Sequence, residues 1–275
     1  MKGIKSMRIY EIIDEENTQS IGVLLYYEKE KSFIIELRDD LNEWTAPLLL
    51  TSYVKKGIFT IPRDISLLWV KERIIPSGRQ NIGSILKNHK LKEYDEMKFL
   101  ELSKGRCSQD SMYIKRLESV PSFVTKRNLK NLTECTALEN NNLLCIFADG
   151  TVKKVSLSAL LSNADVHNDV KKLINNHQLF LSCKIGIGGY YVTFADSIDL
   201  PSWLLYKSGK NIPLSYSDLI AFIKTNLLDT QEACQELACT RQNISYMVAH
   251  DQLKPVKESS MGNLYMKGDV VKNGW

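Results

Sequence analysis

Residues 230–266 constrain the fold of this chain more than any other stretch, because two short helical patterns and a hairpin pattern follow one another there. In the first helical pattern, Ala233 and Leu237 lie four residues apart, which places them on one face of a helix. The second pattern, residues 241–250, has its apolar side chains at helical spacing as well. Residues 238–240 form the turn between them, so we expect a pair of helices.

Polar residues mark where both helices begin. Asp229 or Thr230 can cap the first helix and Thr240 the second, because short polar side chains accept hydrogen bonds from the free N–H groups there. Glu232 falls in the first turn, where a negative charge suits the helix dipole. These signals predict helix starts at about residues 230 and 241.

A hairpin is predicted after the second helix. Residues 253–257 and 264–266 flank a polar tip, residues 258–263. The tip contains Gly262 and Asn263, which suit left-handed turn geometry. We therefore expect a two-stranded hairpin over residues 253–266.

The outward face of the second helix carries side chains that can read DNA. Ile244, Met247 and Val248 form its apolar face, and the polar side chains lie opposite or at its N-terminal end. Arg makes paired hydrogen bonds to guanine, and Gln or Asn to adenine, whereas hairpin residues reach the backbone or minor groove. The predicted DNA-contacting residues are Thr240, Arg241, Gln242, Asn243, Ser245, Tyr246, Lys257, Ser259, Ser260 and Asn263.

This segment resembles the excisionase-like branch of the MerR-related winged-helix family. The matching phrases are Thr-Gln-Glu-Ala at residues 230–233, Thr-Arg-Gln at 240–242 and Leu-Lys-Pro at 253–255. Ala238 and Asp251 stand where that family usually has glycine. The resemblance implies a winged helix-turn-helix that binds double-stranded DNA.

The charge of this segment leaves a second interpretation open. From residue 209 onward, seven Lys and Arg residues are balanced by seven Asp and Glu residues. Because phosphate neutralisation supplies most non-specific affinity, one copy should bind DNA weakly, and we expect a homodimer. The alternative is a protein-interaction adaptor, or a toxin–antitoxin-type partner, in which this segment is structural and the N-terminal domains bind another protein.

We expect an α+β protein with two β-rich mixed domains, residues 1–118 and 119–207, followed by the winged helix-turn-helix, residues 208–275. In the first domain, residues 21–27 and 32–37 predict a hairpin. The order of elements from there to Gly105 resembles the N-terminal lobe of HipA-type proteins. No phosphate-binding glycine loop or metal-binding Asp set follows, so no kinase activity is expected.

The middle segment resembles a small bacterial β-rich domain family of unknown function. The residues that carry the resemblance are Phe147 to Gly150, Phe180, Asp199-Leu200 and Leu205-Tyr206. Asp149-Gly150 between apolar runs is a strong hairpin signal. Residues 179–187 and 190–194 predict a second hairpin.

Residues 217–227 predict an amphipathic helix after a polar linker, residues 207–213. Its apolar side chains, Leu219, Ile220, Phe222 and Ile223, are expected to pack in a core. A dimerising helix is the alternative.

Several classes of protein are not expected. The six cysteines form no Cys-x-x-Cys pair and no nucleophile–base pair is evident, so we predict no enzyme, no metal and no cofactor. Residues 1–20 contain Asp14, Glu15 and Glu16 and no apolar core, so no signal peptide is expected. No apolar run approaches about 18 residues, so we expect a cytoplasmic protein without membrane contact.

Overall fold

The computed structural model describes residues 7–273 of the chain. It is a mixed α+β structure with several antiparallel sheets, as predicted. The chain divides into two compact units. The first comprises the chain up to Leu132 with Ser182–Leu205, and the second comprises Thr133–Leu181 with the chain from Tyr206 onward. The first unit thus draws on two of the predicted domains, whose boundaries at residues 118 and 207 stay predictions.

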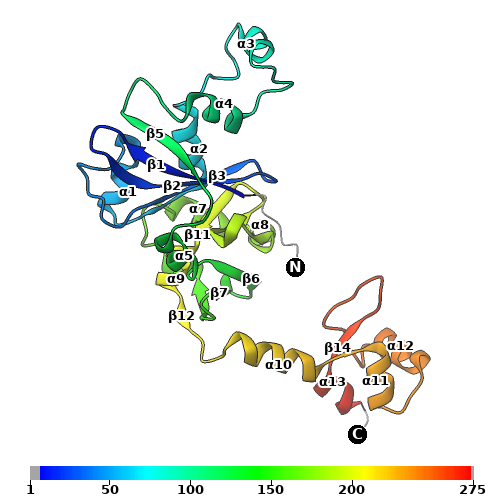
Figure 1. Ribbon diagram of the computed structural model, residues 1–275. Coiled ribbons are helices and arrows are strands. Elements are labelled where there is room, and N and C mark those ends of the chain that lie inside the picture. The colour runs from blue at the N-terminus through cyan, green and yellow to red at the C-terminus, as the bar shows by residue number, and fades with distance from the viewer. Residues whose placement is uncertain (1–6, 274–275) are drawn as a thin grey trace. The chain divides into compact units, whose positions relative to one another are not determined.

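The first unit is built on a five-stranded antiparallel sheet of order β4-β3-β2-β1-β5 (Figure 1). Its strands are β1 (Met7–Asp14), β2 (Gln19–Tyr27), β3 (Ser32–Leu37), β4 (Thr60–Ile61) and β5 (Met112–Leu117). The predicted hairpin is confirmed, because β2 and β3 pair antiparallel with Tyr27 opposite Ser32. The sequence patterns did not identify β1 and β5, which complete the sheet.

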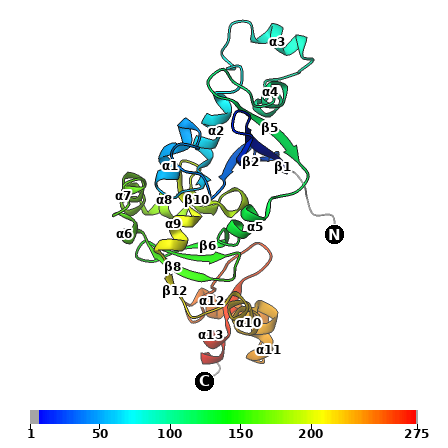
Figure 2. The same cartoon turned by 60° about the vertical axis from the view of Figure 1, so that its left-hand side comes forward.

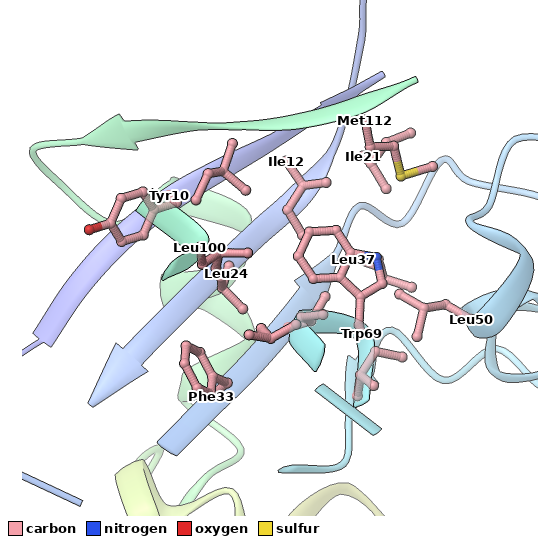
Figure 3. Close-up of a cluster of buried hydrophobic side chains, with 14 of the residues drawn as sticks. Tyr10, Ile12, Ile21, Leu24, Phe33, Leu37, Leu50, Trp69, Leu100 and Met112 are labelled. Carbon is pink, nitrogen blue, oxygen red and sulfur yellow. The ribbon is translucent and has the colours of Figure 1, made fainter. Parts of the chain in front are cut away.

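Both faces of this sheet are buried. Successive strand residues point to opposite faces, and on one face the side chain of Trp69 lies among Ile12, Leu37 and Leu50 (Figure 3). The other face contributes to a second cluster that includes Ile34 and Val124. Two buried faces explain why these strands read as continuous apolar runs, without a polar alternation.

Short helices accompany the sheet. They are η1 (Leu48–Leu50), α1 (Thr51–Lys55), α2 (Arg63–Lys71), α3 (Ile82–Asn88), α4 (Glu96–Ser103) and α5 (Ser122–Asn128). Helix α4 ends at Lys104 and Gly105, whose φ angles of 54° and 70° are left-handed.

A fully buried carboxylate joins β3 to α5. Glu36 has no exposed surface and forms an ion pair with Arg127. Thr60 Oγ1 donates a hydrogen bond to Glu36 Oε2 at 2.9 Å, and Arg127 Nη2 donates to the carbonyl oxygen of Leu37 at 2.9 Å. Burial raises the pKa of Glu36, and the charge of Arg127 and the hydrogen bond from Thr60 oppose that rise.

The remaining part of the first unit is a three-stranded meander of order β11-β10-β9. It contains β9 (Cys183–Ile185), η2 (Ile187–Gly189), β10 (Tyr191–Phe194) and β11 (Ile198–Pro201), and α9 (Ser202–Ser208) follows it. The predicted hairpin is confirmed for β9 and β10. Residues 179–181, expected as its first strand, belong instead to a helix. Gly189 cannot be replaced by a larger residue unless the backbone moves, because a Cβ at this position would lie 2.1 Å from the carbonyl oxygen of Leu132.

The second unit contains a four-stranded sheet of order β12-β8-β7-β6. Its elements are β6 (Leu132–Leu138), β7 (Asn142–Phe147), β8 (Val152–Ser156), α6 (Leu157–Leu160), α7 (His167–Asn175), α8 (His177–Leu181) and β12 (Lys210–Asn211). The turn predicted at Asp149-Gly150 is confirmed: Gly150 has a φ of 82°, and its N–H donates to the carbonyl oxygen of Phe147 at 2.9 Å. Tyr206 donates a hydrogen bond to the Asp149 carboxylate at 2.7 Å.

The C-terminal residues form a small group with its own core. The elements are α10 (Tyr216–Asn226), β13 (Leu227–Asp229), α11 (Thr230–Glu236), α12 (Arg241–Ala249), β14 (Leu264–Met266) and α13 (Lys267–Lys272). In both views α11, α12, α13 and β14 lie together (Figures 1 and 2). Ala233, Ile244, Leu253, Tyr265 and Val270 are buried at their centre.

Two predictions for this group need correction. Strand β14 pairs over its length with β13, Leu227 opposite Met266, rather than with residues 253–257. Of the hairpin expected over residues 253–266, the structure retains an isolated bridge between Lys257 and Leu264. Helix α10 was expected to pack in a core, yet none of its residues is buried.

Among residues 7–273, no helix is both long enough and apolar enough to cross a membrane.

Candidate nucleic-acid interface

Helix α11 begins at a capping box. Asp229 accepts a hydrogen bond from the backbone N–H of Glu232 at 2.8 Å, and the Glu232 carboxylate accepts one from the N–H of Asp229 at 2.8 Å. Of the two capping residues considered from the sequence, Asp229 is therefore the one used. The box fixes where α11 starts, directly after β13.

The turn between α11 and α12 contains a left-handed alanine. Ala238 has a φ of 49°, and the N–H of Cys239 donates to the carbonyl oxygen of Cys234 at 3.0 Å. Asp251, just beyond α12, has a φ of 57°. Both residues stand where the winged-helix pattern usually has glycine, and both adopt the conformation that glycine tolerates without cost. Both turns therefore place non-glycine residues in the left-handed region.

Thr240 caps α12, as predicted, by accepting a hydrogen bond from the N–H of Asn243 at 3.3 Å. Ile244 is completely buried, and this fixes the rotation of the helix. Gln242 consequently points away from the core, and Arg241 and Asn243, in the first turn of the helix, are exposed as well. The sequence pattern had placed Gln242 on the outward face, with Arg241 and Asn243 flanking it at the N-terminal end of the helix.

The exposed face of α12 continues to His250, just beyond its end, which the predicted set lacks. The rings of Tyr246 and His250 stack with their centroids 3.8 Å apart, and 58% of Tyr246 is exposed. His250 Nδ1 lies 2.8 Å from the carbonyl oxygen of Tyr246. The spacing of four residues between Tyr246 and His250 was the sequence signal from which this stacked pair could have been predicted. Ser245 donates its hydroxyl hydrogen to the carbonyl oxygen of Arg241 at 3.0 Å, so it retains only acceptor capacity for another molecule.

The loop after α12 is shaped by its own polar residues. Ser259 Oγ donates to the carbonyl oxygen of Gly262 at 2.7 Å and accepts a hydrogen bond from the N–H of Met261 at 3.3 Å. Ser259 therefore closes the tip, a role that its prediction as a DNA contact did not include. Lys257 and Ser260 are exposed, and Asn263 is half-buried.

A groove of about 590 Å³ lies between the loop, the start of α11 and the start of α12. The predicted contact residues that line it are Arg241, Lys257, Ser259, Ser260 and Asn263. Asp229, Thr230 and Gln231 also line it and were not predicted. Their proximity depends on the pairing of β13 with β14, which no local pattern reveals. The other predicted residues, on α12, do not line the groove: Thr240, Gln242, Asn243, Ser245 and Tyr246.

Arg241 and Lys257 place two cations at the groove, and Asp229 places one carboxylate there. Within the described part of the chain, neither side chain has an ion-pair partner, whereas Arg127 and Arg63, for example, are both paired. Arg241 occupies the first position of α12. A cation at a helix N-terminus is disfavoured by roughly 0.3–1 kcal/mol, because the dipole is positive there. Helix stability therefore does not account for the presence of Arg241 at this position.

No group of three or more His, Cys, Asp or Glu residues in the described part of the chain could hold a metal ion. The chain matches no protein-family model, no curated protein and no solved structure. What α12 and its groove can bind is accordingly argued from their residues.

Proposed function

We propose that this protein binds double-stranded DNA in a sequence-specific manner, as a transcriptional regulator, with residues 227–272 acting as a winged helix-turn-helix. The observation that carries the proposal is the position of Arg241. It is exposed and without an ion-pair partner among the described residues, it lies at the dipole-disfavoured end of α12, and it shares a groove with Lys257.

Helix α12 has suitable dimensions and side chains for the major groove. An α-helix with its side chains is about 10–12 Å across, and the major groove of B-form DNA is about 12 Å wide. In the proposed complex Arg241 and Gln242 contact base edges, with Asn243 and Tyr246 beside them. The completely buried Ile244 anchors the helix, so the backbone of α12 needs little reorganisation on binding.

Residues of the loop take a different part in the proposed complex. Lys257 and Ser260 extend from an irregular segment and contact the phosphate backbone or the minor groove. Such contacts orient a protein on the duplex without selecting a sequence. The groove between loop and α12 then accommodates one DNA strand, with Arg241 on one side and Lys257 on the other.

One copy of this module supplies little electrostatic attraction, because the charges from residue 209 onward cancel. Phosphate neutralisation provides most of the non-specific affinity of DNA-binding proteins. We therefore propose that two copies bind together and that each reads one half-site.

The same cancellation of charge favours a second candidate function, a protein-interaction adaptor whose C-terminal group is structural. A net-neutral surface suits a protein partner better than a polyanion. In that case residues outside the C-terminal group bind the partner, and the exposed face of α12 binds no nucleic acid.

Retardation of duplex DNA in a gel separates the two candidates. In the first step the full chain is mixed with random-sequence duplex at low salt. In the second step the chain selects fragments from genomic DNA, and the retained fragments are sequenced. The proposal requires retardation and an enriched motif, and it requires the double variant Arg241→Ala/Lys257→Ala to lose both. Lys254→Ala is the matched control, since Lys254 is exposed but lies outside the groove. Absence of retardation in the unmodified chain would overturn the proposal and favour the adaptor.

A further inference from the structure

Two thiols lie in contact between neighbouring strands of the second unit. Strand β6 carries Cys135 and β7 carries Cys145, and their Sγ atoms are 3.9 Å apart. The two strands are adjacent in the sheet of order β12-β8-β7-β6 (Figure 1). Both residues belong to the second unit, so the contact arises within one compact part of the chain.

A tight turn between the strands brings the two thiols together. Asn140 and Asn141 have left-handed φ angles of 55° and 53°. Asparagine tolerates this conformation better than most residues, and two such residues in succession suit the turn of a hairpin. Asn142 Nδ2 supports the turn by donating hydrogen bonds to the carbonyl oxygens of Glu139 and Asn140, at 2.9 and 3.1 Å. The turn thus places side by side two cysteines that are ten residues apart in the sequence.

The two thiols differ in their access to a dissolved reagent. Cys145 is completely buried, whereas Cys135 is half-buried. Strand β6 stands last in the order of its sheet, and several of its residues are exposed. Because a thiolate must meet its reaction partner directly, a small molecule reaches Cys135 before Cys145.

We propose that Cys135 and Cys145 form a reversible redox site, at which a low-molecular-weight disulfide converts the two thiols into a disulfide between β6 and β7. In the first step the thiolate of Cys135 attacks one sulfur of the reagent, which gives a mixed disulfide and releases one reagent thiol. In the second step the thiolate of Cys145 attacks Cys135 Sγ and displaces the second reagent thiol. The two protein thiols lose two electrons and two protons, and the reagent disulfide takes up both to become two thiols.

The geometry favours the second step. The Sγ atoms are 3.9 Å apart and must approach to about 2.05 Å, the length of a disulfide bond. A neighbour held within about 4 Å reacts as though its concentration were far above the millimolar level of a dissolved thiol. The mixed disulfide on Cys135 should therefore be short-lived, and closure by Cys145 should prevail.

The disulfide would attach an edge strand covalently to the sheet. Thr133, Glu134 and Thr136 of β6 are exposed, so few buried contacts hold this strand. Oxidation should consequently slow hydrogen exchange of the β6 amides, and reduction should restore it. The site lies outside residues 227–272, so the inference goes beyond the proposed function and does not depend on it.

Peptide mapping of the folded full chain tests the proposal, with oxidised glutathione as the reagent. Remaining thiols are alkylated before digestion with trypsin. Residues 131–153 form one tryptic peptide, which contains these two cysteines and no other, and cleavage after Glu139 separates the two and reveals a link between them. The internal disulfide should exceed the mixed disulfide at least about tenfold, and reduced glutathione should regenerate both thiols.

Three variants test the order of attack. Cys145→Ala should accumulate glutathione on Cys135, at least about tenfold above the unmodified chain, whereas Cys135→Ser should leave the buried Cys145 unmodified. Cys107→Ser is the matched control. Cys107 is also half-buried, but its Sγ lies 3.5 Å from Asp110 Oδ1, and its replacement should not change the map of residues 131–153. Thermal melting checks that each variant is folded.

The map of the unmodified chain by itself can overturn the proposal, even if a variant fails to fold. It does so if both cysteines of residues 131–153 remain open to alkylation, if the mixed disulfide on Cys135 persists, or if Cys135 is linked to a cysteine of another peptide. Equal labelling of Cys135→Ser and Cys145→Ala by glutathione would overturn the order of attack. Because no DNA is present, gel retardation decides the proposed function separately.

Discussion

The backbone of Lys257 pairs with that of Leu264 in an isolated bridge, in which the N–H of Leu264 donates to the carbonyl oxygen of Lys257 at 2.9 Å. Leu264 is also paired with Asp229, the residue that caps α11. The bridge therefore ties Lys257 to the start of α11, at one edge of the groove. The loop is positioned at this point even though it has almost no strand structure of its own.

A first prediction concerns Lys257. If it contacts a phosphate, Lys257→Ala should weaken binding to all DNA sequences alike and lower the salt dependence of log K by about one unit. Lys254→Ala removes the same charge outside the groove, beside Asp251, and should have a smaller effect. Affinity measured against salt concentration by fluorescence anisotropy compares the two. Equal effects of both substitutions would contradict the assigned role.

Arg241 should act on sequence instead. Its exposed guanidinium can make two parallel hydrogen bonds to guanine, so Arg241→Ala should lose about 1–3 kcal/mol of discrimination at one base pair. Arg241→Lys keeps the charge but not the paired geometry, and it should lose discrimination while retaining most of the affinity for random DNA. Competition between the selected motif and single-base variants measures this difference. A uniform loss at every base pair would assign Arg241 to the backbone.

The left-handed turn makes a prediction about stability. Ala238 has a φ of 49°, so Ala238→Gly should relieve strain and stabilise the C-terminal group by about 1 kcal/mol. The same substitution at Ala221, within α10, should destabilise that helix by roughly 0.8–1 kcal/mol. Hydrogen exchange of the α11 and α12 amides should slow about fivefold in Ala238→Gly. Faster exchange would mean that the turn is not left-handed in solution.

The ion pair between Glu36 and Arg127 makes a prediction about the first unit. Arg127→Met leaves the fully buried Glu36 without its cation, and should lower the free energy of unfolding by about 3–5 kcal/mol. Arg38→Met breaks an exposed pair with Asp40 and should cost less than about 1 kcal/mol. Urea unfolding of each variant measures both values.

The double variant Glu36→Leu/Arg127→Met completes this test. It removes the buried charge together with its partner, so it should recover most of the stability that Arg127→Met loses. If the double variant is as unstable as the single one, packing around Arg127 matters more than its charge.

Local chemistry made several elements of this protein predictable from the sequence. Asp229 with Glu232, Thr240 with Asn243, and the turn at Asp149-Gly150 each involve residues at most three positions apart. Their hydrogen bonds form within one segment, so the residue types suffice to place them. The exposed side of α12 followed in the same way, because helical spacing puts Ile244 opposite Gln242.

The tertiary structure alone decided which segments lie beside one another. Strand β14 could pair with residues 253–257 or with β13, and the sequence favoured the former because those residues are nearer in the chain. The structure pairs it over its length with β13 and keeps one bridge to Lys257, and together these contacts bring Gln231 and Asp229 into the groove with Lys257. It likewise left Tyr216, Phe222 and Ile223 of α10 exposed, although the helix has the apolar pattern of a core helix. Amphipathic spacing shows that a face needs a partner, but the identity of that partner depends on contacts between residues distant in the sequence.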